Sequence, residues 1–180
     1  HDAVHAAVPD LPADRILGEP VGRDTAPCIG WGARVARREG AERLLVVPAD
    51  HYIPDGDAFV ATLRRALGAV DRGALVTIGV RPRGPETGYG YLEIGDEVHR
   101  GVHRVVRFVE KPDIEHARVY AASGRHLWNS GMFLFTPQAI DAAILRHLPE
   151  LHQGLDAIER DPSSLGRIYP RARPPPSPSP

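Results

Sequence analysis

Lysine, cysteine and long apolar runs are all scarce in this sequence. Of its 22 lysine and arginine residues only Lys111 is a lysine. The single cysteine, Cys28, excludes an internal disulfide and a cysteine-based zinc site, and a small free thiol is expected to be buried. The apolar runs are far shorter than the roughly 20 residues needed to cross a bilayer, and no signal-peptide pattern opens the chain. We therefore expect a soluble, cytoplasmic protein without a membrane partner.

Net charge is also nearly absent, at −1, with arginines scattered among acids, so we expect no nucleic-acid partner. The 180 residues, 42% of them hydrophobic, suffice for one α/β domain, which we place at residues 1–170. The chain opens at His1 without a methionine, and residues 171–180 form a Pro/Ser tract predicted to be a disordered tail. We accordingly expect a domain truncated at both ends.

Two short apolar runs predict the strands of a Rossmann-like unit. Leu44–Val47 and Ala74–Val80 are continuous apolar stretches, typical of strands buried in a parallel sheet. Between them, Asp57 is placed to cap a helix whose apolar side chains recur at helical spacing up to Val70. This order of strand, helix and strand favours a right-handed parallel crossover.

The remaining elements follow from capping residues and from apolar periodicity. Asp24 or Thr25 is expected to cap a helix that ends near Arg38, with Gly40 as its stop. The other expected elements are a strand over 103–109, a helix over 114–123 between Asp113 and Gly124, a buried strand over 131–135, and a helix from Thr136-Pro137 through Leu148.

Asp50 and Lys111 are candidate charged groups of a phosphate site. Asp50 follows a predicted strand, at the edge where open α/β sheets bind ligands, and its carboxylate is the hard oxygen ligand that Mg²⁺ prefers. The alternative is an aspartate that caps a turn. Lys111 survives where other cations have become arginine, which points to a need for a compact ammonium, although chance survival at a solvated turn is equally consistent.

Three polar motifs are candidates for ligand contact. Pro85–Tyr91 places glycines around tyrosines, which suits close approach to a sugar ring, and Leu127–Gly131 places Asn129 before a buried strand. Glu19–Pro27 combines a glycine turn with free amides at a helix N-terminus. Taken singly, each is also consistent with an ordinary turn or a capped surface helix.

Together and in this order, these segments resemble the mannose-1-phosphate guanylyltransferase family of sugar nucleotidyltransferases. The matching strings are EPVGRDTAPCIGWGA (19–33), LLVVPADHYIPD (44–55), TIGVRPRGPETGYGYLEIG (77–95), FVEKPD (108–113) and SGRHLWNSGMFLF (123–135). The sequence departs from the family pattern in three ways. Asp24 stands where members usually carry asparagine, no glycine-rich GGxGTRLWPLSR loop is present, and no second metal-binding aspartate follows the last match.

The resemblance implies a Rossmann-like three-layer α/β/α nucleotidyltransferase domain of GT-A-like type. It implies that GMP is transferred from GTP to α-D-mannose 1-phosphate with Mg²⁺ as cofactor, giving GDP-mannose and pyrophosphate, and that the protein is a possible homo-oligomer. Because the glycine-rich loop is missing, we expect weak or absent turnover. The alternatives are a catalytically dead module that binds sugar nucleotides, and a nucleotidyltransferase for another hexose 1-phosphate.

The resemblance also assigns roles to individual residues. Asp50 would hold Mg²⁺ and contact the nucleotide, and Lys111 would neutralise phosphate charge. The remaining assignments are nucleoside contacts by Thr25, Ala26 and Pro27, and sugar contacts by Tyr89, Gly90, Glu110 and Asn129.

Overall fold

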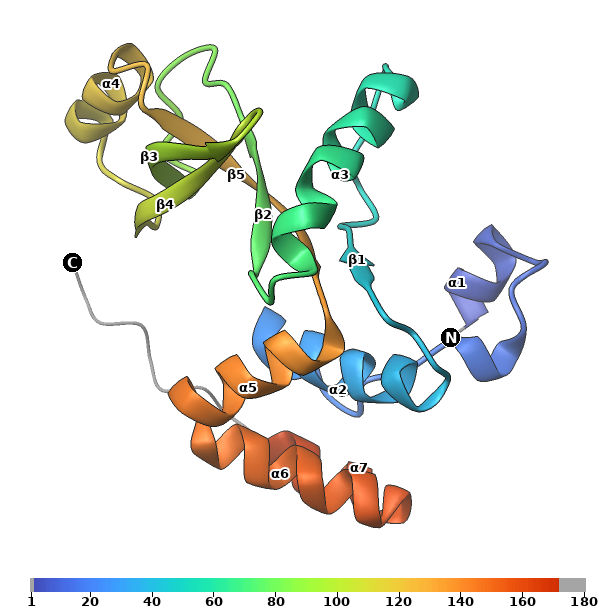
Figure 1. Cartoon of the computed structure of the whole chain (residues 1–180). Helices are drawn as coiled ribbons and strands as arrows, with labels where there is room; N and C mark the ends of the chain where they lie inside the picture. Colours follow the sequence, from blue (N-terminus) through green and yellow to red (C-terminus); the bar gives the residue numbers. More distant parts are fainter. Residues whose placement is uncertain (1, 172–180) are drawn as a thin grey trace. The chain divides into compact units, whose positions relative to one another are not determined.

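The computed structural model describes residues 2–171, and these form two compact units. One unit is Arg43–Thr136; the other combines the described residues up to Glu42 with those from Pro137 onward. The α-helices and strands of both are labelled in Figure 1. Of the predicted tail 171–180, Arg171 ends a short 3-10 helix and residues 172–180 lie outside the described residues. The prediction of a single domain over 1–170 stays a prediction.

The unit 43–136 is a five-stranded antiparallel sheet with two helices. Its elements are β1 (Leu44–Val46), α3 (Gly56–Val70), β2 (Val76–Val80), β3 (Tyr91–His99), β4 (Val102–Val109), α4 (Ile114–Ala122) and β5 (His126–Phe135). The long strand β5 is central: β1, β2 and β3 all pair with it, and β4 pairs with β3. Every strand register in this unit is therefore set directly or indirectly by β5.

The predicted parallel crossover is wrong in its pairing. β1 and β2 do flank a helix, but each pairs antiparallel with β5, so Leu134 faces Leu45 on one side and Val76 on the other. The intervening strand comes from a segment far along the chain, which a local apolar pattern does not reveal. β1 is also less buried than predicted, with Leu45 41% exposed, because among the described strands only β5 pairs with it.

Helix ends in this unit follow the capping chemistry of the sequence, with one shift. α3 is capped by Asp55, whose carboxylate accepts from the Ala58 amide, and not by Asp57 as predicted; Asp57 lies inside the first turn. α4 begins as predicted, because the Asp113 carboxylate accepts from the His116 amide. It also ends as predicted, before Gly124 in the left-handed conformation (φ 67°).

Two apolar clusters attach the helices to the sheet. Ala66 and Val70 of α3 pack on Leu134 of β5, and Ala117 and Tyr120 of α4 pack with the fully buried Tyr91 of β3. These clusters fix opposite ends of β5, so its middle, residues 129–131, is held in place from both sides.

The second unit is helical. Its elements are α1 (Asp2–Ala7), η1 (Ala13–Arg15), α2 (Thr25–Arg38), α5 (Pro137–His147), α6 (Pro149–Arg160), η2 (Pro162–Ser164), α7 (Leu165–Ile168) and η3 (Tyr169–Arg171). α2 has the predicted bounds and ends before Gly40, whose φ is 86°. Ile144, Leu151 and Leu155 form its buried core, with Trp31 packed against them.

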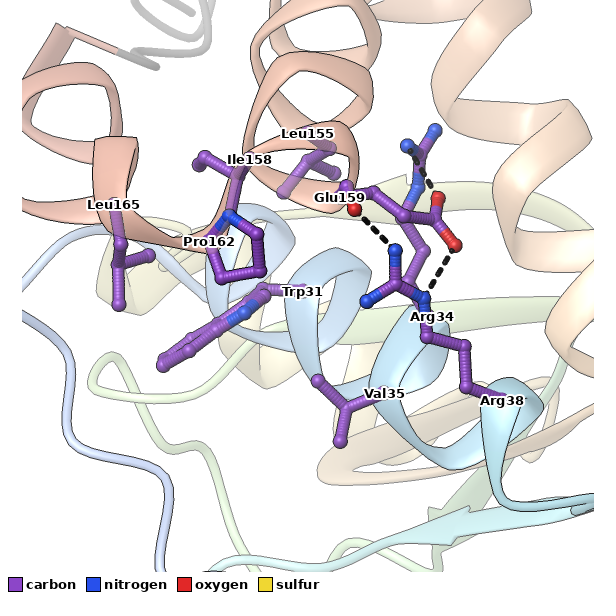
Figure 2. A pocket seen from close by; sticks show the side chains of 9 residues that line it. All are labelled: Trp31, Arg34, Val35, Arg38, Leu155, Ile158, Glu159, Pro162 and Leu165. Atoms are coloured by element: carbon purple, nitrogen blue, oxygen red, sulfur yellow. Dashed lines mark hydrogen bonds and ion pairs between the residues drawn. The ribbon is translucent and has the colours of Figure 1, made fainter.

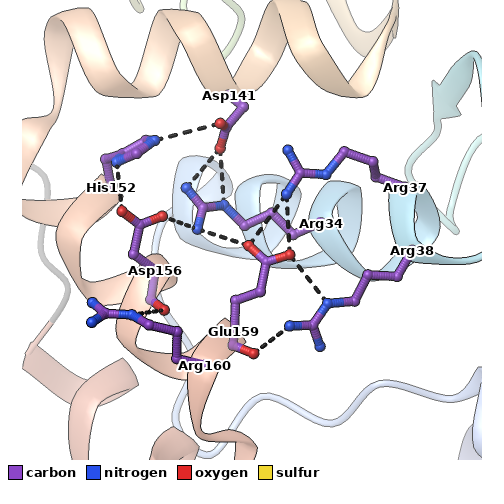
Figure 3. Close-up of polar contacts among 8 residues, drawn as sticks. All are labelled: Arg34, Arg37, Arg38, Asp141, His152, Asp156, Glu159 and Arg160. Carbon is purple, nitrogen blue, oxygen red and sulfur yellow. Dashed lines mark hydrogen bonds and ion pairs between the residues drawn. The ribbon is translucent and has the colours of Figure 1, made fainter.

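A buried arginine ties α2 to the two long helices of this unit (Figure 3). Arg34, 4% exposed, donates to Asp141 of α5 over 2.9 Å and to Asp156 and Glu159 of α6 over 2.5 and 3.2 Å. Burial by itself lowers the pKa of Arg34, but hydrogen bonds to Asp156 and Asp141 reverse this and raise it above its usual range. The guanidinium therefore stays charged and joins three helices.

Beside this network lies an apolar cavity of about 180 Å³ (Figure 2). Trp31 and Val35 of α2 line one side, and Ile158 and Pro162 line the other. None of the predicted site residues lines it. No helix among residues 2–171 is both long and apolar enough to cross a membrane.

Candidate functional site

The predicted sugar motif around Asn129 forms a bulge in β5. Thr77 pairs with Phe133 and Gly79 with Asn129, so the single residue Ile78 faces three residues of β5. Within the bulge Gly131 has φ 71°, a left-handed conformation that favours glycine. The sequence pattern predicts a strand that begins at Gly131, with a polar turn before it as the alternative interpretation of 127–131. The strand instead runs through it, from His126 to Phe135.

Side chains replace the ladder hydrogen bonds that the bulge removes. The Gly131 amide donates to Asn129 Oδ1 (3.3 Å), and the Met132 amide donates to Ser130 Oγ (3.2 Å). Ser130 Oγ in turn donates to the Ile78 carbonyl (2.7 Å), and Thr77 Oγ1 donates to Asn129 Oδ1 (2.9 Å). The asparagine is thus held by both its own strand and the neighbouring one.

The structure brings the two predicted sugar motifs together. The main-chain amide of Asn129 donates to the Gly90 carbonyl over 2.8 Å, and the ring of Tyr89 meets that of Trp128 edge-on at 5.3 Å. A Cβ on Gly90 would lie 2.7 Å from the Phe108 ring and 3.2 Å from Glu110 Oε2. Gly90 is therefore needed for close approach and not for a special φ. The four residues predicted to contact the sugar thus lie together, and we call them the sugar patch: Tyr89, Gly90, Glu110 and Asn129.

Asp50 follows β1 as predicted, in a turn, with its side chain 87% exposed. His51 Nε2 lies 3.9 Å from its carboxylate. Two residues earlier, Pro48 Cγ is 3.5 Å from where a Gly131 Cβ would stand, so this turn begins beside the β5 bulge. Among the described residues no three His, Cys, Asp or Glu side chains gather as a metal cage. A magnesium ion at Asp50 would take its other ligands from phosphates and water, which is the usual mode for Mg²⁺.

Lys111 stands in a strained backbone conformation. Its φ is 43°, the one positive value outside glycine among residues 2–171. Its side chain is 65% exposed, and Nζ lies 3.7 Å from Glu110 Oε1. The ammonium is thereby placed beside the sugar patch. The convergence of Lys111 and Asp50 on one pocket stays a prediction.

The predicted nucleoside residues occupy the first turn of α2. Thr25 and Ala26 open the helix and Pro27 is buried there, where proline's missing N–H costs nothing. Asp24 is the N-cap by backbone geometry but makes no side-chain capping bond. Its carboxylate is therefore not committed to the helix.

The loop before α2 is held by Glu19, whose carboxylate accepts from the hydroxyl of the fully buried Tyr169. Partial desolvation, followed by the negative charge of Glu19, raises the pKa of Cys28. The predicted burial of Cys28 is wrong, because the residue is exposed on α2. Its helical position turns it away from the buried face of α2, which carries Pro27, Gly30 and Ala33.

Thr77 and Phe108 are two neighbours of the sugar patch that sequence reasoning missed as site residues. Both lie inside strings that resemble the family, but a threonine and a phenylalanine in strands are typical of ordinary sheet residues. Strand alternation could have placed Thr77 on the face opposite to Val76. The contact of Thr77 with Asn129 could not be predicted in this way, because the pairing of β2 with β5 joins segments far apart in the chain.

A wider cleft of about 1070 Å³ lies between α3, β2 and the β3–β4 hairpin. Arginines contribute to its lining, and no carboxylate does. None of the residues predicted for sugar, nucleotide or metal contact is among those that line it. Thr77, whose hydroxyl bonds Asn129 Oδ1, does line it, so the cleft adjoins the sugar patch at this residue.

Comparison with known proteins identifies the family of the chain. The nucleotidyl transferase family profile matches residues 12–159. The chain is 49% identical over 144 residues to the xanthan biosynthesis protein XanB of Xanthomonas campestris pv. campestris, covering 79% of this chain and 29% of that protein. It is 43% identical over 160 residues to mannose-1-phosphate guanylyltransferase of Escherichia coli (strain K12), covering 84% and 33% respectively. The chain thus spans about a third or less of the length of these curated relatives.

Two solved structures also resemble the chain. A mannose-1-phosphate geranyltransferase from Thermus thermophilus superposes with a TM-score of 0.81 at 40% identity, covering 88% of this chain and 47% of that one. A mannose-6-phosphate isomerase from Helicobacter pylori superposes with a TM-score of 0.66 at 31% identity, covering 76% and 50%. The predicted Rossmann-like α/β class is confirmed, and the chain belongs to the nucleotidyl transferase family.

Proposed function

We propose that this protein transfers GMP from GTP to α-D-mannose 1-phosphate. A phosphate oxygen of the sugar phosphate attacks the α-phosphorus of GTP, the bond from that phosphorus to the bridging oxygen of the β-phosphate breaks, and pyrophosphate leaves as GDP-mannose forms. The observation that carries the proposal is the hydrogen bond from Asn129 to Gly90, because it unites the two motifs expected to contact the sugar. The named guanylyltransferase relatives support the choice of substrates.

The sugar patch offers groups suited to a hexose. Tyr89 presents an exposed ring beside Trp128, Gly90 leaves room at the backbone, and Glu110 and Asn129 supply an acceptor and a donor for hydroxyl groups. Because hydroxyl orientation is what separates one hexose from its epimers, polar groups fixed in position can discriminate between them.

The charged groups suit phosphate chemistry. Such transfers depend mainly on positioning and on neutralising charge that develops on phosphate oxygens. Lys111 would supply a mobile ammonium beside the patch, and Asp50 would hold Mg²⁺, which supplies charge neutralisation of the phosphates when bound. Thr25, Ala26 and Pro27 would line the nucleoside site with the free amides of the first turn of α2. With GTP as substrate, we place the reaction in the cytoplasm.

Calorimetry with GDP-mannose tests the proposal on this chain. We expect saturable binding that Asn129→Ala and Glu110→Ala weaken, and weaker binding of GDP-glucose and UDP-glucose. A pyrophosphate-release assay with GTP, Mg²⁺ and mannose 1-phosphate then measures turnover. Equal or tighter binding of UDP-glucose would assign the protein to another hexose 1-phosphate. Binding without any turnover, even with the family's glycine-rich segment fused to the chain, would favour a binding module instead of an enzyme.

A further inference from the structure

Asn129 is held with one end of its amide group occupied and the other open. The Gly131 main-chain amide can only donate, so the side-chain atom that it contacts at 3.3 Å is the oxygen Oδ1. Thr77 Oγ1 lies 2.9 Å from the same oxygen. Two donors therefore occupy both lone pairs of Oδ1. Within residues 2–171, no group accepts a hydrogen bond from Nδ2, and Asn129 is only half-buried.

Thr77 reaches this position through the register of the sheet. Val76 faces the α3 cluster, so Thr77 points to the other face of β2. The bulge over residues 130–132 then brings Asn129, which would otherwise pair further along, next to the threonine hydroxyl. The Met132 carbonyl lies farther from the hydroxyl, at 3.2 Å, so the single hydroxyl proton is directed to Asn129 Oδ1 at 2.9 Å and the carbonyl is the secondary acceptor.

We infer that Thr77 is a positioning residue: its hydroxyl holds Oδ1 of Asn129 and so directs the Asn129 NH₂ group toward an oxygen lone pair of the sugar. Asn129 then acts as a donor and does not accept from a sugar hydroxyl. The inference rests on the proposed function, because it specifies how the sugar patch recognises its ligand. The recognised group of the sugar is then an acceptor oxygen, and the position of the Asn129 side chain is set by a residue on a neighbouring strand.

Asn129→Asp is the sharpest test of the donor role. Aspartate is nearly the same size, and one carboxylate oxygen can still accept from Gly131 and Thr77, so the bulge is kept. The open end changes from two N–H donors to a charged acceptor. We expect the affinity for GDP-mannose to fall more than about tenfold, as for Asn129→Ala, with little change in the thermal unfolding midpoint.

A pair of substitutions at position 77 tests the positioning role. Thr77→Val removes the hydroxyl and keeps the shape, whereas Thr77→Ser keeps the hydroxyl. We expect Thr77→Val to weaken GDP-mannose binding by about tenfold and to reduce its preference over GDP-glucose, while Thr77→Ser stays within about twofold of the unsubstituted chain. The side-chain NH₂ resonances of Asn129, followed by ¹⁵N NMR without ligand, should move in Thr77→Val and stay in place in Thr77→Ser.

The outcomes separate this inference from the proposed function. No binding of any sugar nucleotide by the unsubstituted chain contradicts the proposed function itself. Normal binding that survives Asn129→Asp or Thr77→Val, with epimer preference intact, overturns only the inference. A loss of affinity in Thr77→Val that is matched in Thr77→Ser also overturns it, because the effect would then follow from packing and not from the hydroxyl.

Discussion

The main-chain amide of Asn129 donates to the carbonyl of Gly90, and this 2.8 Å bond joins two motifs from separate parts of the chain. It fixes the start of β3 against the middle of β5, directly beside the bulge. Phe108 and Glu110 of the β4 segment close over Gly90 from the other side. The patch therefore depends on backbone proximity at residue 90.

Gly90→Ala should impair ligand binding more than folding. The added Cβ would stand 2.7 Å from the Phe108 ring and 3.2 Å from Glu110 Oε2, so both side chains must move away. The half-exposed ring can shift, and we expect a loss of about 1–3 kcal/mol in the free energy of unfolding. Affinity for GDP-mannose, measured by calorimetry, should fall at least about tenfold.

Gly88→Ala is the matched control, because nothing lies within 4 Å of a Cβ at position 88. Its affinity and stability should both stay close to those of the unsubstituted chain. Equal losses in the two variants would show that the region needs glycine for flexibility and not for close approach at Gly90.

Lys111→Gly should separate stability from binding. The residue adopts φ 43°, which costs a side-chain-bearing residue energy but costs glycine little. We expect a gain of about 1 kcal/mol in the free energy of unfolding, measured with urea, together with about tenfold weaker GDP-mannose binding because the ammonium is gone.

Lys111→Arg keeps the positive charge and the strain, so its stability should match that of the unsubstituted chain. If the compact ammonium is what the diphosphate needs, its affinity should also fall, because the planar guanidinium has a different shape and reach. Full affinity in Lys111→Arg would show that any cation serves at this position.

Arg34→Met should strongly destabilise the helical unit. Removal of the buried guanidinium leaves Asp141, Asp156 and Glu159 without their shared partner, and we expect a loss of about 3–5 kcal/mol in the free energy of unfolding. Arg38→Met is the control. Arg38 also bonds Glu159 but is 49% exposed, so its loss should cost under about 1 kcal/mol. Urea denaturation followed by circular dichroism measures both; similar losses would contradict a special role for Arg34.

Protonation of the buried His126 ring should make the sheet unit less stable in mild acid. Its ring is 6% exposed and stacks on Tyr120 at 4.3 Å; Nδ1 lies 2.7 Å from Ser123 Oγ, while Nε2 is buried without a partner among the described residues. Burial lowers the pKa of His126, with Arg107 and Arg125 acting in the same direction and Glu93 opposing them.

Because the folded chain resists protonation at His126, the unfolded chain binds more protons below its ordinary pKa of about 6.5. The stability conferred by the neutral ring is present above that pH and is lost as the pH falls toward the lowered folded pKa. His126→Phe should flatten the decline of unfolding free energy between about pH 6.5 and 5, by up to about 1.4 kcal/mol per pH unit. His147→Gln, at a position outside the core, should leave the decline unchanged; an equal effect would contradict the assignment.

Local chemistry predicted most of the elements correctly. The capping carboxylate of Asp113, the stops at Gly40 and Gly124 and the apolar run at 131–135 each act within a few residues, so the sequence alone placed α4, the end of α2 and the core of β5. The shift of the α3 cap from Asp57 to Asp55 has the same origin, since both carboxylates are near the helix start and only the backbone decides which one accepts.

The sequence by itself determined the α/β class, the family resemblance and the residue types of the sugar patch, because these depend on spacing and side-chain chemistry along the chain. Only the tertiary structure decided that β5 lies between β1 and β2, that a bulge brings Asn129 to Thr77, and that Arg34 joins three helices. Those arrangements pair segments far apart in the sequence. Their partners are chosen by the burial of whole faces and by hydrogen-bond satisfaction across strands, which no local pattern encodes.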